Sequence, residues 1–257
     1  MEQLKVIKVG GKIVEETDTL NILLNDYAKV EGRKILVHGG GRSATKISAQ
    51  LGIETQMIDG RRVTDAETLK VVTMVYAGLV NKTIVASLQS RGINAIGVCG
   101  ADAGIILSNK RPATPIDYGY VGDVVKVDGE MLANLLQGGT YPVVAPITHD
   151  GKGNLLNTNA DTIASEVAKG VAEKFDVTLI YCFEKPGVLM DENDDNSVIP
   201  LINHEKFEEL KAAGIVSGGM LPKLQSAFKA LEAGVKEVVI THASAIDNPQ
   251  AGTHIVL

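Results

Sequence analysis

The chain has 257 residues, of which 45% are hydrophobic and 22% charged, so it can bury enough apolar surface to fold and is not disordered. Lys and Arg number 25 and Asp and Glu 31, a formal net charge of −6, which argues against sequence-independent binding of nucleic acid. We find no apolar run near the roughly 18 residues of a membrane span and no signal-peptide pattern at the N-terminus. We therefore expect a cytoplasmic protein without a membrane or nucleic-acid partner.

Apolar segments typical of buried strands alternate with helical patterns along the chain. Helical spacing of apolar residues is clear in 17–27 and 64–79, where Thr17 and Thr64 are suited to cap a helix. Because the strand segments are apolar on both faces, we expect an open three-layer αβα sandwich with a mostly parallel sheet. The expected strands lie in residues 4–10, 34–38, 93–99, 141–147, 177–183, 236–242 and 253–257.

Two places depart from this alternation. In residues 104–128, two short strand-like runs are separated by Pro112, Pro115 and Gly119, which predicts a hairpin. A helical pattern ends near residue 175, and the best boundary between two lobes falls there. We therefore expect one lobe at 1–175 and a second at 176–257.

Two of the early strands end in glycine clusters. Gly10 and Gly11 follow the first strand, and Gly39, Gly40 and Gly41 follow the second. Glycine lets backbone N–H groups turn toward an anion, and the helix that follows adds its positive N-terminus. Each cluster can be a plain tight turn. Because ligands of open α/β sheets bind at the carboxyl ends of strands, two of them indicate a shared phosphate or carboxylate site.

Three charged residues stand in unusual positions. Lys8 lies inside an apolar strand, where its charge needs an anion unless the side chain reaches solvent at a sheet edge. Lys223 follows Gly218 and Gly219 at a helix start, where a cation opposes the helix dipole and needs a nearby anion. Asp161 fits either the first turn of a helix or a polar cleft, and both interpretations remain open.

Other polar residues are candidates for binding. The Arg62 guanidinium suits a substrate carboxylate, although the side chain can also be merely exposed. Asn157 and Asn159 add polar groups, and Asn159 can cap the following helix. His38 has no Ser or Cys partner in a recognisable triad, so we expect it to be structural.

Two known nucleotide-binding motifs can be compared with the sequence. A P-loop enzyme is excluded because the chain lacks GxxxxGK[ST]. Gly39, Gly41 and Ala44 fit the dinucleotide motif GxGxx[GA], and Asp59 lies about twenty residues further on, so an NAD-dependent oxidoreductase stays an alternative. The motif follows the second strand, however, and the first strand already carries its own glycine pair.

Together the motifs resemble the amino acid kinase family. The matching segments are IKVGGK at 7–12, LVHGGGR at 36–42, GRRVTDAETLKVV at 60–72, NLLNTNADTIAS at 154–165 and GGMLPKL at 218–224. The resemblance implies ATP- and Mg²⁺-dependent phosphorylation of the γ-carboxylate of N-acetylglutamate, or of a related N-acylglutamate, in arginine biosynthesis. It places the acylamino acid in the first lobe and ATP in the second. Aspartate or carbamate kinase activity and a non-catalytic amino-acid sensor remain alternatives.

The resemblance also implies roles for single residues. Lys8 and Lys223 match lysines that stabilise the transferring phosphoryl group, and Asp161 matches the aspartate that orients them. The Phe183–Lys185 segment departs from the Thr/Ser-Asp-Val sequence usual in this family, so the adenine and ribose contacts stay open. The implied substrate-binding residues are Gly40, Gly41, Arg62, Asn157 and Asn159. The implied nucleotide-binding residues are Gly11, Glu184, Lys185, Gly187, Leu189, Ile215, Val216 and Ser217.

The absence of a catalytic histidine agrees with this chemistry. A γ-carboxylate with a pKa of about 4.3 is ionised at neutral pH and needs no general base. The reaction needs relief of the repulsion between that carboxylate and the triphosphate, which lysines, glycine N–H groups and Mg²⁺ can supply. Few carboxylates accompany these residues, so we expect the metal to be held by phosphate oxygens and not by protein ligands.

Two further expectations concern assembly and the acyl group. Seven residues precede Lys8, which leaves no room for the N-terminal helix that links arginine-inhibited members into hexamers, so we expect a homodimer insensitive to arginine. Arg61 stands where members usually have an apolar residue or Gln. Its guanidinium can accept a second carboxylate, as on a succinyl group, or lie in solvent. Because neighbouring residues of an extended segment point to opposite sides, acetyl is the default expectation.

Overall fold

The computed structural model describes residues 1–257, and its centre is an eight-stranded sheet of order β12-β14-β13-β11-β1-β2-β8-β5. Neighbouring strands are parallel except for β13 and β14. The predicted strands and the antiparallel pair within 104–128 are confirmed. A four-stranded sheet, β10-β9-β6-β7, and the hairpin β3-β4 hold the remaining strands. The bounds are β1 (Gln3–Val9), β2 (Arg33–His38), β3 (Met57–Ile58), β4 (Arg61–Arg62), β5 (Ala95–Val98), β6 (Ile106–Lys110), β7 (Gly122–Val127), β8 (Tyr141–Val144), β9 (Ile147–His149), β10 (Leu155–Asn157), β11 (Asp176–Phe183), β12 (Leu201–Ile202), β13 (Glu237–His242) and β14 (Thr253–Ile255).

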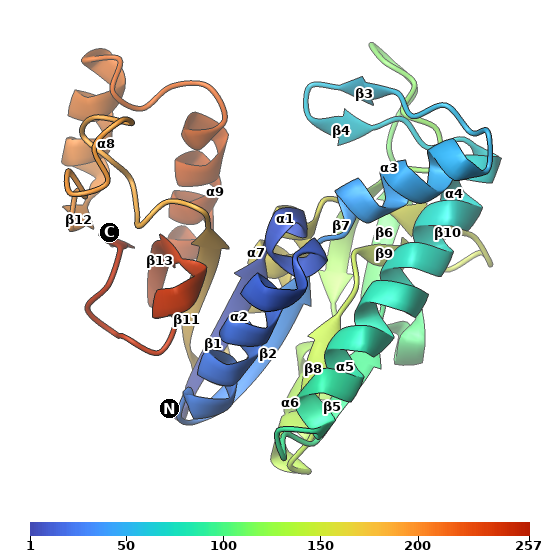
Figure 1. Cartoon of the computed structure of the whole chain (residues 1–257), viewed down its shortest axis with the longest axis horizontal. Coiled ribbons are helices and arrows are strands. Elements are labelled where there is room, and N and C mark those ends of the chain that lie inside the picture. Colours follow the sequence, from blue (N-terminus) through green and yellow to red (C-terminus); the bar gives the residue numbers. More distant parts are fainter.

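Helices cover both faces of the large sheet (Figure 1), as predicted. Successive side chains of a strand point to opposite faces, so Leu4 and Val6 of β1 enter one core cluster while Ile7 and Val9 enter the other. The first cluster includes α6, α7, α8 and α9, and the second includes α2, α4, η1 and α5. The helical bounds are α1 (Gly11–Glu15), α2 (Thr17–Lys29), α3 (Gly41–Gln50), α4 (Ala66–Val72), the π-helical η1 (Thr73–Val80), α5 (Asn81–Gln89), the 3₁₀ turn η2 (Asp102–Gly104), α6 (Gly129–Gln137), α7 (Ala160–Val171), α8 (His204–Ala212), α9 (Met220–Glu232) and the 3₁₀ turn η3 (Ala243–Ala245).

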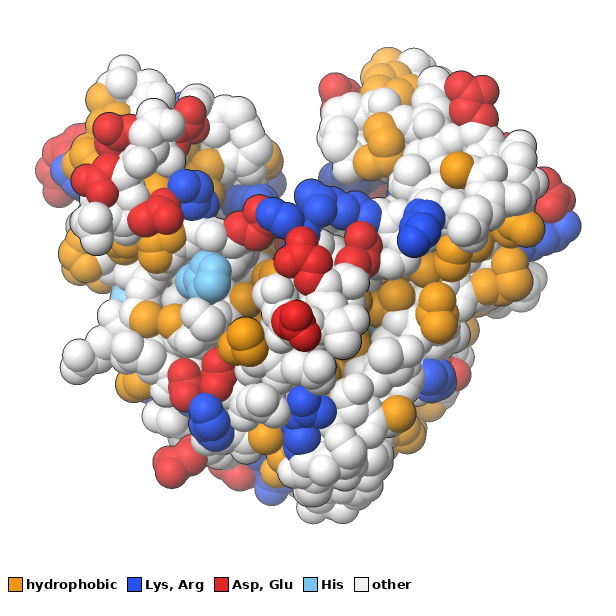
Figure 2. Space-filling view, viewed as in Figure 1, with side chains coloured by type: hydrophobic (Ala, Val, Ile, Leu, Met, Phe, Trp, Pro, Cys, Tyr) orange, Lys and Arg blue, Asp and Glu red, His pale blue; other side chains and the backbone are white.

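The large sheet continues across the expected lobe boundary at residue 175. Strand β11 pairs with β1 on one side and with β13 on the other, so the two parts share one sheet. Above it, the β3-β4 hairpin and α3 rise on one side, and α8 and α9 rise on the other (Figure 1). A notch separates these raised parts, and Lys and Arg side chains lie along its floor (Figure 2).

Two helix starts differ from the expected caps. The cap of α2 is Glu16 and not Thr17, and the cap of α4 is Asp65, whose side chain accepts the Thr68 N–H at 2.7 Å. Thr64 is used elsewhere, because its hydroxyl donates to the Arg62 carbonyl at 3.0 Å. The α4 cap is therefore one position later than predicted, and the α2 cap is one position earlier.

Elements α4, η1 and α5 form one continuous helix, Ala66–Gln89. By length and composition it could span a membrane, because an 18-residue window has a mean hydropathy of 1.5. The expectation that no apolar segment approaches the length of a membrane span is therefore wrong. Within that window 44% is buried inside the chain. Helical spacing in 64–79 places Val71, Met74, Val75 and Leu79 on one face. In the structure Val71 and Val75 face the core, but Met74 and Leu79 are exposed. The wider π-helical turn of η1 shifts the phase of the side chains.

Candidate active site

The two glycine loops lie against each other at the floor of the notch. The Gly39 N–H donates to the Val9 carbonyl at 3.1 Å. A Cβ on Gly39 would lie 3.1 Å from the backbone nitrogen of Gly11, so only glycine permits this approach without a shift of the backbone. The cap of α3 is Gly40, which has no side chain to occupy the first N–H groups of the helix. These groups can therefore bind an anion.

A hairpin places two arginines over these loops. Asp59 and Gly60 join β3 to β4, and their φ values are 49° and 73°, the left-handed backbone that a tight Asp-Gly hairpin turn requires. Arg61 and Arg62 follow directly in β4. Because Asp59 occupies this turn and not the end of a strand in the large sheet, it is not placed as the ribose-binding acid of a dinucleotide fold.

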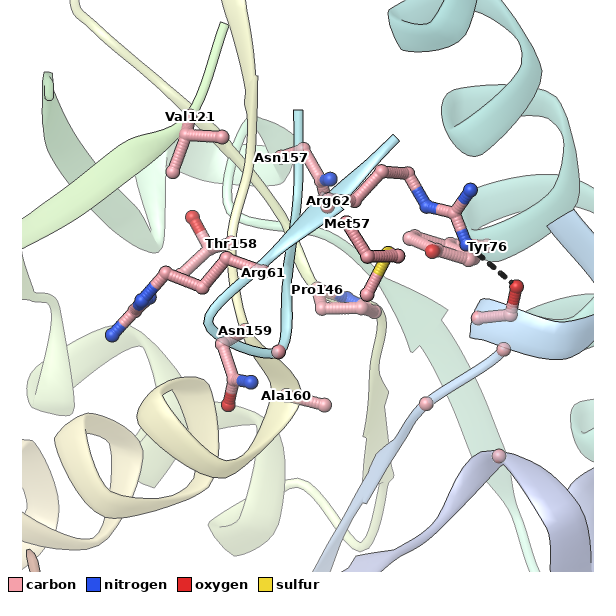
Figure 3. Close-up of a pocket in the computed structure, with 15 residues that line it drawn as sticks. Met57, Arg61, Arg62, Tyr76, Val121, Pro146, Asn157, Thr158, Asn159 and Ala160 are labelled. Carbon is pink, nitrogen blue, oxygen red and sulfur yellow. Dashed lines mark hydrogen bonds between the residues drawn. The ribbon is translucent and has the colours of Figure 1, made fainter. Parts of the chain in front are cut away.

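Arg62 forms one wall of a cavity of about 190 Å³ beside the glycine loops (Figure 3). The residue is buried, and its guanidinium donates to the Gly41 carbonyl at 2.8 Å, to Thr45 Oγ1 at 2.8 Å and to Thr55 Oγ1 at 3.1 Å. These bonds fix the side chain in place. A guanidinium has five N–H donors, so the Nε–H and one Nη1–H of Arg62 remain beyond these three bonds.

Two asparagines complete this cavity. Asn157, at the end of β10, donates from its side-chain amide to Thr64 Oγ1 at 3.0 Å. Asn159 caps α7, because its Oδ1 accepts the N–H groups of Asp161 at 2.8 Å and Thr162 at 3.2 Å. The predicted cap is therefore confirmed. Asn159 also lines the cavity, so the capping and cleft interpretations both describe its position.

Two lysines converge on one aromatic ring next to this cavity. Lys8 Nζ, on β1, lies 2.6 Å from Asp161 Oδ1, and the two side chains are 8% and 29% exposed. Phe183 lies beneath both cations, with its ring centroid 3.7 Å from Lys223 Nζ and 5.5 Å from Lys8 Nζ. Burial lowers the pKa of Lys223, against the raising effect of Asp161, and Lys8 adds to the lowering. Two cations beside one carboxylate leave a positive charge that suits an anionic ligand.

A second cavity, of about 600 Å³, adjoins the lysine pair on the side of α9. Lys12 and Glu184 face each other there, with Nζ and Oε2 2.6 Å apart. The predicted nucleotide residues Gly11, Glu184, Lys185 and Gly187 line this cavity. The other four, Leu189, Ile215, Val216 and Ser217, do not line it, and Val216 is part of the apolar core. Its N–H bonds to the Leu210 carbonyl at the end of α8.

His38 supports the second glycine loop. Its Nδ1 lies 2.8 Å from the Gly39 carbonyl oxygen and its Nε2 lies 3.1 Å from Asn81 Nδ2. Burial lowers the pKa of His38 to about 4, so the ring is neutral at pH 7. Nδ1 then donates to Gly39, and Nε2 accepts from Asn81. These bonds agree with the structural role expected for this residue.

Sequence reasoning missed several residues of the site. The Tyr76 ring packs against Gly40 and lines the first cavity, but in the sequence it is one more residue in an apolar helical pattern. In the sequence, Phe183 stands out only because it departs from the family pattern. The Lys12–Glu184 pair joins positions 172 residues apart, and a lysine directly after a glycine pair was the one available signal.

The fold and these residues define an α/β protein with adjacent anion sites at the carboxyl ends of its central strands. The model of the amino acid kinase family matches residues 3–242, and the chain belongs to this family. This confirms the family resemblance and the fold, and it leaves the dinucleotide alternative without support.

The relatives are similar over nearly the whole chain. Acetylglutamate kinase of Bacteroides fragilis is 65% identical over 254 residues, covering 99% of this chain and 97% of that protein. Acetylglutamate kinase of Cytophaga hutchinsonii is 55% identical over 262 residues, covering 100% and 99%. Among solved structures, N-acetylglutamate synthase of Neisseria gonorrhoeae has a TM-score of 0.83 at 22% identity, covering 100% of this chain and 59% of that one. At this identity the last likeness shows the fold alone.

Proposed function

We propose that the chain phosphorylates the γ-carboxylate of an N-acylglutamate of the N-acetylglutamate type with ATP, as a step of arginine biosynthesis. One observation carries the proposal: an arginine and asparagine cavity lies directly beside a lysine–aspartate cluster. The first can hold a carboxylate, and the second can hold the phosphoryl group that is transferred. The names of the relatives, which match over nearly their whole length, support the same activity.

In the proposed reaction, a γ-carboxylate oxygen attacks the γ-phosphorus of ATP. The new P–O bond forms as the bond to the bridging oxygen breaks, and ADP leaves. Lys8 and Lys223 reduce the repulsion between the two anions and stabilise charge in the transition state. Asp161 holds Lys8 at 2.6 Å and is a positioning residue. No proton is transferred, so the site needs no general base.

The substrate is held from the opposite side of the cavity. Arg62 binds the α-carboxylate through its positive charge and one remaining N–H donor. Asn157 and Asn159 face the acylamino part, and the backbone N–H groups of Gly40 and Gly41 bind oxygen atoms of the transferring group. The bonds of Arg62 to α3 and to Thr55 fix its orientation before the substrate arrives, which favours productive positioning.

The nucleotide is proposed to lie in the second cavity, along Gly11, Glu184, Lys185 and Gly187. The chain has no group of three or more His, Cys, Asp and Glu side chains that could hold a metal ion. Mg²⁺ is therefore proposed to arrive with ATP, coordinated chiefly by phosphate oxygens. In this arrangement residues 1–175 bind the acylamino acid and residues 176–257 bind most of the nucleotide.

A cytoplasmic homodimer is proposed as the working form. The helix Ala66–Gln89 exposes Met74 and Leu79, with 56% and 58% of their surfaces accessible. We infer that this helix is covered in the dimer, because contiguous exposed apolar surface marks protein–protein contacts. Light scattering of the purified chain tests this, because a monomer or hexamer mass contradicts it.

The activity is tested by trapping the product. Purified chain with ATP, Mg²⁺ and N-acetylglutamate is expected to form an acyl phosphate, which hydroxylamine converts to a hydroxamate, with one ADP released per turnover. Aspartate and carbamate are offered in parallel. A higher kcat/KM for either of these, or no hydroxamate with any N-acylglutamate, would refute the proposal.

A further inference from the structure

The first cavity carries two arginines and no carboxylate. Its lining combines glycine and small polar residues with Met57, Tyr76, Val121 and Pro146, and Arg61 and Arg62 are its only charged members. The proposed function assigns Arg62 to the α-carboxylate and the lysine pair to the γ-carboxylate. N-acetylglutamate has no third negative group that could pair with Arg61.

The two arginines differ in how they are bonded. Arg62 uses three donors within the chain, whereas Arg61 makes no side-chain hydrogen bond or ion pair, although it is only partly exposed. Asp123 is the acidic side chain whose charge acts on Arg61, and its carboxylate is already bonded by Arg111 through Nε at 3.1 Å and through Nη2. Burial and the charge of Arg111 lower the pKa of Arg61, and the charge of Asp123 acts in the opposite direction. A half-buried guanidinium in this position is unpaired, and an added anion would stabilise it.

Arg61 also lies where the first cavity meets another. Figure 3 shows the two arginine side chains leaving the hairpin in opposite directions, with Arg61 running past Thr158. Arg62 reaches the Gly41 carbonyl at 2.8 Å. Gly60, Arg61 and Asn159 belong both to the first cavity and to a neighbouring one of about 340 Å³, whose lining also includes Lys223 and the carboxylates of Asp59 and Asp161. There is therefore open space at Arg61 for a substrate group longer than acetyl.

We propose that the acyl group of the substrate ends in a carboxylate of its own, as in N-succinylglutamate, and that Arg61 binds this carboxylate and determines specificity. This rests on the proposed function and refines its substrate class. A succinyl group extends acetyl by one CH₂ and one carboxylate. Each of the three carboxylates then has a cationic partner: the lysine pair for the γ-group, Arg62 for the α-group and Arg61 for the acyl tail. The opposite directions of the arginines, which made acetyl the default from sequence, now place the two cations at separate ends of the acylamino acid.

The test compares three substrates in four proteins. The substrates are N-acetylglutamate, N-succinylglutamate and N-succinamoylglutamate, whose acyl tail ends in an uncharged amide of nearly the same size as the succinyl carboxylate. The proteins are the wild type, Arg61→Leu, Arg61→Lys and, as a matched control, Arg91→Leu. Arg91 lines neither cavity, and its removal changes the net charge by the same amount.

In the wild type, we expect kcat/KM for the succinyl substrate to exceed that for the other two by tenfold or more, the effect of one charge-assisted hydrogen bond. Arg61→Leu should lose this preference through KM while its kcat/KM for N-acetylglutamate changes less than about threefold, which also shows that the variant is folded. Arg61→Lys should keep part of the preference, and Arg91→Leu all of it.

The outcomes separate this inference from the proposed function. Wild-type preference for the acetyl substrate, or equal losses for all substrates in Arg61→Leu, overturns the role of Arg61 and leaves the kinase intact. Equal use of the succinyl and succinamoyl substrates shows selection by size and also overturns it. Failure of every substrate in the wild type overturns the proposed function itself.

Discussion

Replacing Lys8 by Met should separate the catalytic role of this lysine from its structural role. Methionine keeps an unbranched side chain of similar length, so the main change in β1 is the loss of one charge. Asp161 loses a partner at 2.6 Å. A charged acceptor left without its partner costs about 1–3 kcal/mol of unfolding free energy. Because Asp161 is 29% exposed, water replaces part of the interaction, and we expect the lower half of that range.

The effect on kcat should be larger, and restoring the stability of the fold should not restore kcat. Loss of one preorganised donor to a transition-state anion lowers kcat by roughly 10²–10³-fold. Adding Asp161→Asn removes the unpaired charge, so the double variant should regain most of the unfolding free energy while kcat stays low. Lys34→Met is the control: Lys34 is a buried lysine of the neighbouring strand β2, bonded to the Val30 carbonyl at 2.6 Å, and its loss should lower stability with little change in kcat.

Urea unfolding gives the stabilities, and ADP release gives kcat and KM for the four proteins. If the double variant recovers kcat together with stability, Lys8 acts only through the fold and the proposed mechanism is wrong. Near-normal kcat in Lys8→Met alone would refute it equally.

Three other perturbations are predicted. Arg62→Ala should raise KM for the acylglutamate much more than KM for ATP in steady-state assays, and the reverse order would show that the two cavities are misassigned. Lys12→Ala or Glu184→Gln should raise KM for ATP several-fold. The unfolding free energy should change by less than about 1 kcal/mol, since the two side chains are 39% and 52% exposed. An unchanged KM for ATP would show that the pair does not belong to the nucleotide site. His38 has a pKa of about 4 when folded against about 6.5 when unfolded, so the unfolded chain takes up the proton first and stability falls as pH drops from about 6.5 to 4, by about 3 kcal/mol in total. Urea unfolding of His38→Gln should lack this part of the acid sensitivity, and an unaltered slope would contradict it.

Much of the fold follows from local patterns. Strands such as 177–183 are apolar on both faces because helices cover both sides of the sheet, and that pattern predicts the sandwich. The order of the strands is different, because it depends on pairing between distant segments such as β1 and β11. The α4 cap is one residue from its predicted place because Thr64 bonds to Arg62, a contact that no helix-start pattern contains.

The residues of the candidate site also fall into two groups: some are found from local patterns, and others depend on contacts between distant segments. A glycine after a strand and a lysine inside one are local anomalies, so Gly39 and Lys8 could be found from sequence. Phe183 could not be assigned, because its role is to lie beneath two lysines that are 215 positions apart in the chain. Val216 shows the opposite case: its position in the family pattern suggests a nucleotide contact, and the structure shows that its side chain fills the core.

The local charge of the site differs in sign from that of the whole chain. The chain carries −6, yet six cations line the two main cavities, namely Lys12, Arg42, Arg61, Arg62, Lys185 and Lys223, and Glu184 is the one carboxylate in these linings. The Lys8–Asp161 pair adjoins them. At physiological salt, charges more than about 8 Å apart are largely screened, so the acidic surface elsewhere has little influence on a bound triphosphate. A ligand therefore experiences mainly the local excess of positive charge. This explains how an acidic protein can bring together two anions, a carboxylate and a triphosphate, which repel each other in water.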